Sequence, residues 1–206
     1  TKDKGCKRFC TESEHLYAVD DLSEALTLIQ ERDTHRATLC GTIETKIDSG
    51  EYPGLMDLIT STIANHIWDV DWIVEADAAY SYDDELEDVA VVKCEFATPD
   101  GHPEFRVVDY RNDILVMQAS IRLEINATCG FSFSVRDTID HDSMHIGDAT
   151  VVTKDTVTVE VLLTIENPNI GTPEIVEIEL IPSRQNLNFG SIQPDFRDED
   201  PNSEYY

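Results

Sequence analysis

The spacing of hydrophobic residues changes from a helical to a strand-like period near residue 68. Before this point, residues 19–31 and 51–67 carry apolar side chains three and four positions apart, which predicts two amphipathic helices. Residues 31–42 between them are rich in polar side chains. We therefore expect a polar connection there, with a domain boundary near residue 38.

Beyond residue 68, apolar and polar side chains alternate in several segments. Strict alternation is typical of antiparallel strands that are buried on one face and exposed on the other. The sequence therefore predicts an α+β fold, in which a helix leads into an antiparallel β sandwich or a strongly bent sheet. The regular strands are expected at 120–127, 130–136, 156–166 and 174–181, and less regular ones near 70–79, 88–97, 104–110 and 145–153.

The chain is strongly acidic, with 15 Lys and Arg against 42 Asp and Glu and a net charge of −27. Residues 41–206 carry 9 basic and 34 acidic side chains, so their net charge is −25. A surface of this sign repels phosphate, which argues against direct nucleic-acid binding and against docking on an anionic membrane. Adaptation to high salt, a surface for a basic protein partner, and mimicry of nucleic acid each account for the acidity.

The cysteines favour a reducing compartment. All five stand at irregular spacings without a CxxC pair, which is weak evidence for a zinc site and is typical of free thiols. No apolar run approaches the length of a membrane-spanning helix, and no secretory signal is apparent. We therefore expect a cytoplasmic protein without a membrane partner.

Residues 1–30 resemble the C-terminal segment of a PIN-like nuclease domain. In that segment a late strand ends near an acidic residue, and a Phe-Cys pair, a short strand and a final helix follow. Gly5 and Cys6 depart from the pattern, because one branch of the family often has Asp and Trp there. The matching residues are Thr1, Lys2, Asp3, Lys4, Phe9, Cys10, Leu16 and the run Leu22 to Ile29.

The resemblance implies a nuclease that uses Mg²⁺ or Mn²⁺ bound by three or four carboxylates to cleave RNA, in the manner of toxin or defence enzymes. It assigns Asp3 to the last carboxylate of this set, as a catalytic metal ligand, and places the others upstream of Thr1. A lone carboxylate does not hold such an ion. We therefore expect the chain to be an inactive C-terminal fragment. The alternative for Asp3 is a carboxylate at a strand end or a helix N-cap.

A second acidic group falls in the run "RDTIDHDSMH". Asp137, Asp140 and Asp142 there are candidate metal ligands, and the alternative is a β-turn in which Asp side chains accept from backbone N–H groups. Calcium is disfavoured because the segment has neither the Gly nor the closing Glu of an EF-hand loop. The acidic residues at 82–89 are expected in a solvated loop.

These observations predict three parts: residues 1–38 as the end of a PIN-like domain, residues 39–190 as a β-rich accessory domain, and residues 191–206 as a mobile acidic tail. In this interpretation RNA is contacted only by the full-length nuclease. The alternative is that the chain is a complete acidic binding module for a basic protein partner. A calcium-stabilised β domain is a third possibility.

Overall fold

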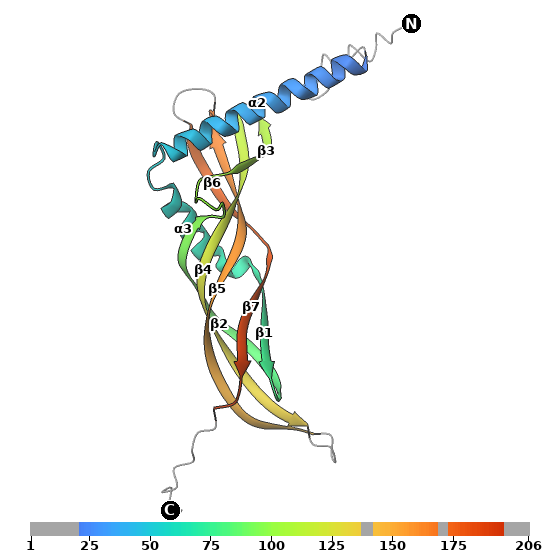
Figure 1. The fold of residues 1–206 in the computed structure, drawn as a ribbon, viewed down its shortest axis with the longest axis vertical. Coiled ribbons are helices and arrows are strands. Elements are labelled where there is room, and N and C mark those ends of the chain that lie inside the picture. Colours follow the sequence, from blue (N-terminus) through green and yellow to red (C-terminus); the bar gives the residue numbers. More distant parts are fainter. Residues whose placement is uncertain (1–20, 137–141, 169–172, 196–206) are drawn as a thin grey trace, which may run out of the picture.

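The computed structural model describes residues 21–136, 142–168 and 173–195, and it has an elongated shape with a helix across one end (Figure 1). Helix α2 (Leu22–Asp48) is followed by α3 (Leu55–His66) and the 3-10 turn η1 (Ile67–Asp69). The combination of helices with a mainly antiparallel sheet confirms the predicted α+β class. The strands are β1 (Asp71–Ala78), β2 (Ser81–Phe96), β3 (Phe105–Arg111), β4 (Ile114–Arg136), β5 (Ser143–Glu166), β6 (Glu174–Ile181) and β7 (Arg184–Ile192).

The larger sheet is built around two very long strands. Strands β4 and β5 pair in antiparallel fashion from Ile114 opposite Glu166 to Arg136 opposite Ser143. Strand β6 pairs with β5, and both β2 and β3 pair with β4. The sequence predicts four shorter strands where β4 and β5 run without a break. That prediction was wrong, because β4 continues through Thr128–Gly130 and β5 continues through Lys154 and Asp155 without interruption.

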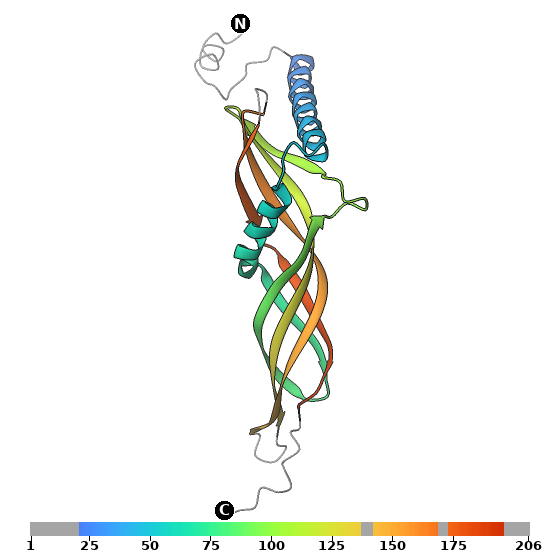
Figure 2. The same cartoon turned by 90° about the vertical axis from the view of Figure 1, so that its left-hand side faces the viewer.

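Strands β2 and β3 lie end to end along the same edge of β4. Phe96 at the end of β2 faces Ile121, and Phe105 at the start of β3 faces Ala119. Residues 97–104 therefore form an excursion from one interrupted edge strand, which stands out from the side of the sheet in Figure 2. The rings of Phe96 and Phe105 meet edge to face at 5.7 Å and close the base of this loop.

Strands β1 and β7 form a separate two-stranded sheet that is parallel. The sequence predicts only antiparallel pairing, and it predicts no strand at 184–192, so both expectations were wrong. Strand β7 also ends at Ile192, inside the segment predicted as a tail. The remaining tail residues, 196–206, lie outside the described part of the chain.

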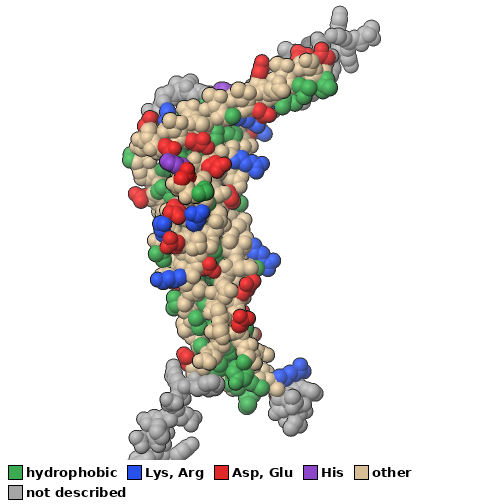
Figure 3. Space-filling model, in the orientation of Figure 1, with side chains coloured by type: hydrophobic (Ala, Val, Ile, Leu, Met, Phe, Trp, Pro, Cys, Tyr) green, Lys and Arg blue, Asp and Glu red, His purple; other side chains and the backbone are tan. Residues whose placement is uncertain are grey.

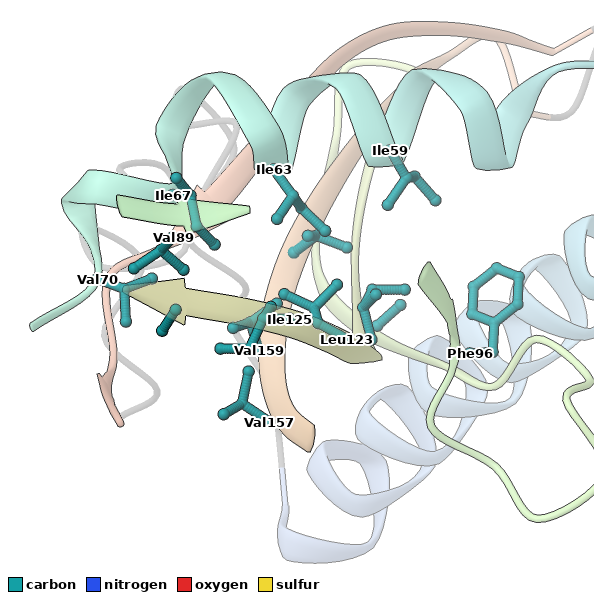
Figure 4. Close-up of a cluster of buried hydrophobic side chains, with 14 of the residues drawn as sticks. Ile59, Ile63, Ile67, Val70, Val89, Phe96, Leu123, Ile125, Val157 and Val159 are labelled. Atoms are coloured by element: carbon teal, nitrogen blue, oxygen red, sulfur yellow. The ribbon is translucent and has the colours of Figure 1, made fainter. Parts of the chain in front are cut away.

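The core follows from the alternation in β4 and β5. Every second residue of β4 from Leu115 to Phe133 is buried, and so is every second residue of β5 from Val157 to Ile165. Helix α3 contributes Ile59 and Ile63, which point toward Leu123 in Figure 4. One face of the sheet is therefore dry, and the other carries the polar residues of the same strands.

Helix α2 is longer than predicted. Asp21 caps it by accepting from the backbone N–H of Glu24 at 2.9 Å, and the helix continues through residues 31–42 to Asp48. The prediction of a polar connection was wrong. A helix can continue through polar residues when packing of one part against the core stabilises the whole helix. The hydroxyls of Thr34 and Thr38 donate to the carbonyl oxygens one helical turn earlier at 2.8 Å, so they are satisfied within the helix.

Candidate functional site

The N-terminal half of α2 projects past the sheet and carries an exposed apolar stripe. Leu22, Leu26 and Ile29 are 75%, 49% and 57% exposed. Their spacing, four positions and then three, places them on one face of the helix. Figure 3 shows hydrophobic side chains on the underside of this projecting part. We call these three residues the α2 stripe.

The C-terminal half of α2 is anchored to β3. Leu39 and Ile43 are buried, and the Sγ of Cys40 donates to the carbonyl oxygen of Phe105 at 3.2 Å. The Glu44 carboxylate accepts from the backbone N–H of Phe105 at 2.9 Å. These contacts fix the helix at the start of β3 by both apolar packing and hydrogen bonds.

The stripe lies on the same side of α2 as the anchor. At about 3.6 residues per turn, Cys40 follows Leu22 by about five complete turns, so the two side chains share one face of the helix. Ile47 follows Ile29 by the same separation. Cys40 is buried and Ile47 packs against the core. The α2 stripe is therefore the outward continuation of the face that packs on the sheet.

The Cys40 thiol, which anchors α2, is unreactive near neutral pH. Burial raises the pKa of Cys40 to about 12, and the neighbouring Glu44 carboxylate adds to the rise. The thiolate is the form that attacks electrophiles and binds metals, so Cys40 is a poor nucleophile or ligand near neutral pH. Burial likewise raises the pKa of Cys129 to about 11. The described cysteines, Cys40, Cys94 and Cys129, are all free thiols, as the sequence predicts.

Most of the metal ligands predicted from the sequence lie outside the described residues. Asp3 precedes residue 21, and Asp137 and Asp140 fall in the gap at 137–141. Asp142 is described and exposed just before β5. Within the described ranges, no group of three or more His, Cys, Asp or Glu side chains is arranged to hold a metal ion.

The acidic run at 82–89 lies in a strand. It belongs to β2, so the prediction of a solvated loop was wrong. Its acidic side chains are exposed, while Tyr82 and Leu86 are half-buried and Val89 is buried. Among the described strands, β2 pairs only with β4. Charges along a free edge oppose pairing with another sheet, which gives this run a structural role.

A cavity of about 510 Å³ with both polar and apolar lining lies beneath the loop at 97–104. Its walls are the loop, the start of β3, and the polar faces of β4 and β5. The sequence offers no local sign of this site, because the cavity depends on the loop leaving an edge strand that then resumes beside β4. The lining residues are Ala97, Thr98, Pro99, Glu104, Phe105, Arg106, Gln118, Ser120, Thr158 and Glu160.

No helix within the described ranges is long and apolar enough to cross a membrane. Comparison of the chain with protein-family models, curated proteins and solved structures found no match.

Proposed function

We propose that this chain is the C-terminal portion of a PIN-like nuclease that depends on Mg²⁺ or Mn²⁺ and cleaves RNA, and that its β-rich part is a non-catalytic accessory domain. The observation that carries the proposal is the α2 stripe. The exposed stripe supports the proposal that α2 is shared between two folded units, one being the β-rich domain and the other lying upstream. The order of side chains in residues 1–30 resembles the end of a PIN-like domain, which supplies the identity of that unit.

The α2 stripe leaves three large apolar side chains in solvent. Full burial of a Leu or Ile side chain contributes about 1.5–3 kcal/mol of favourable free energy. Three such side chains on one face of a helix therefore form an apolar surface whose burial by another unit would be strongly favourable. An amphipathic helix normally turns such a stripe toward a core. Because the stripe continues the face that packs on β3, the covering unit would lie on the sheet side of α2.

The upstream unit is the natural occupant of this surface because residues 1–20 lead directly into α2. In the resemblance, Asp3 is one carboxylate of the metal site and the remaining ligands come from upstream. The bound ions would activate water and stabilise the leaving oxygen of a phosphodiester. This chain would contribute one ligand, Asp3, and a fixed attachment for the accessory domain. The 206-residue chain alone would then be inactive.

The proposal is tested by RNA cleavage with the full open reading frame and with the 206-residue chain, each with Mn²⁺ and with EDTA. The full-length protein should cleave RNA only with the divalent ion, and the shorter chain should not cleave. The variant Asp3→Asn should lose cleavage, while Asp83→Asn, which removes one exposed carboxylate from β2, should retain it. Thermal unfolding of both variants checks that the fold is kept. An Asp3→Asn protein as active as its parent would refute the assignment.

A second candidate function is a binding module for a basic protein. The exposed acidic side chains along the β2 edge favour it. A complex held by such a surface should weaken steeply between about 0.1 and 1 M salt because the charges are screened. Salt adaptation predicts the opposite for the fold, since screening reduces repulsion within a chain of net charge −27.

A further inference from the structure

The cavity beneath the 97–104 loop holds a carboxylate in a fixed position. Glu160 is half-buried on the polar face of β5 and lines the cavity. The hydroxyl of Ser120 donates to its Oε1 at 2.7 Å, and the amide nitrogen of Gln118 donates to its Oε2 at 3.2 Å. Both donors are neutral, so they orient the carboxylate without neutralising its charge.

Glu160 also retains capacity to accept further hydrogen bonds. A carboxylate has about four lone-pair sites, of which two are used here. No ion pair within the described residues includes Glu160. A half-buried and oriented anion at the wall of a cavity is a strong acceptor for a charged donor.

The neighbouring residue on β4 shows which donor suits this surface. Arg122 lies two positions beyond Ser120 and on the same face of the strand. Its Nη2 donates to the carbonyl oxygen of Ala97 at 2.8 Å, and its Nη1 lies 3.5 Å from Oε1 of Glu95. The base of the loop therefore already binds one guanidinium, and Glu160 offers a similar acceptor that has no cationic partner among the described residues.

We propose that this cavity binds a guanidinium group, with Glu160 as its counter-ion. The planar fork of a guanidinium matches a carboxylate in two parallel hydrogen bonds, which an ammonium ion does not reproduce. The net charge of −27 favours cations and disfavours anionic ligands. Two lining residues of opposite charge, Glu104 and Arg106, are exposed. The inference is independent of the proposed nuclease function, because none of these residues belongs to α2 or to the upstream segment.

The test is a titration of the isotope-labelled 206-residue chain with agmatine, followed by amide chemical shifts. Shifts should concentrate at Ala97, Thr98 and residues 118–120 and 158–160, which border the cavity. The variant Glu160→Gln should weaken binding by about tenfold or more, because a charge-assisted pair is lost. The matched variant Glu177→Gln, which removes one exposed charge from β6 outside the cavity, should leave the affinity within about twofold.

A second variant keeps the test decisive if Glu160→Gln disturbs the fold. Thr158 is an exposed lining residue, and Thr158→Lys should abolish binding by placing an ammonium beside Glu160. Blocked arginine separates the sources of the guanidinium. Binding equal to that of agmatine indicates an arginine side chain of a protein, and binding of agmatine alone indicates a free small molecule.

Two outcomes would overturn the proposal. One is an equal loss of affinity in Glu160→Gln and Glu177→Gln, or shifts of similar size with tetramethylammonium, since both indicate diffuse attraction to an acidic surface. The other is the absence of localised shifts at agmatine concentrations of about 10 mM, which corresponds to binding weaker than about 3 kcal/mol.

Discussion

The two halves of α2 should respond very differently to the same kind of truncation. Ile43 is 0% exposed in the anchored half, and Leu26 is 49% exposed in the projecting half. Replacing a buried Ile with Ala costs about 2–5 kcal/mol through lost burial and the remaining cavity. Ala is a better helix former than Ile by a few tenths of a kcal/mol, which offsets a small part. We expect Ile43→Ala to lower the free energy of unfolding by about 3 kcal/mol.

Leu26→Ala should change the free energy of unfolding by less than about 0.5 kcal/mol, because Leu and Ala have similar helix propensities and the side chain is half in solvent. The assay is urea unfolding of the 206-residue chain, followed by circular dichroism at constant salt. A shift of the midpoint at unchanged slope reports stability alone. If Leu26→Ala were as costly as Ile43→Ala, the α2 stripe would already be covered within this chain. The argument for an upstream covering unit would then fail.

Three further predictions concern single side chains outside the proposed sites. The Asp48 carboxylate lies 3.1 Å from Nδ1 of His102 and raises the pKa of that imidazole. The contact therefore stabilises the fold below about pH 6.5, and this stabilisation is lost as the pH rises through the raised pKa. An NMR titration should show a lower His102 pKa in the variant Asp48→Asn. Gly130→Ala should stabilise by about 0.5 kcal/mol in thermal unfolding. The new methyl would crowd only the flexible end of Glu87, and it would lie at ordinary van der Waals distance from the backbone oxygen of Glu85. An unfolding midpoint below that of the parent would contradict this prediction. Cys40 should react with iodoacetamide at pH 8 far more slowly in the folded chain than in the urea-unfolded chain, because burial raises its pKa to about 12. Mass spectrometry measures both rates. Equal rates would contradict the prediction, because they would show that the thiol is accessible and ionised in the folded chain.

The parts of the fold that the sequence predicts are those with a regular local spacing of hydrophobic residues. The alternation from Ile121 to Phe133 sets the dry face of β4, and the structure buries those side chains. The stripe of Leu55, Ile59 and Ile63 gives α3 in the same way. In β4 and in α3 the spacing of hydrophobic residues reflects the burial of one face against the core, so the sequence alone identifies both elements.

The unpredicted part depends on partners that are distant in the chain. Strand β1 pairs with β7, with Asp71 opposite Arg184, and no local pattern encodes a parallel pairing across that separation. The continuation of α2 through residues 31–42 depends on burial of Ile43 against the sheet. The cavity at Glu160 depends on a loop that interrupts an edge strand, so its residues come from separate elements.

Asp3, Asp137 and Asp140 lie outside the described residues, so their roles stay predictions. The structure places Leu22, Leu26 and Ile29, which belong to the segment that resembles a PIN-like domain, as an exposed stripe on α2.

The most direct test of the central claim is the coding sequence immediately upstream of the Thr1 codon. The account predicts about 100 or more in-frame codons, enough for the rest of a domain, with an Asp after a first apolar strand and further acidic residues to complete the ligand set with Asp3. A start codon or a cleavage site directly before Thr1 would contradict the account, because no upstream unit would then exist to cover the α2 stripe.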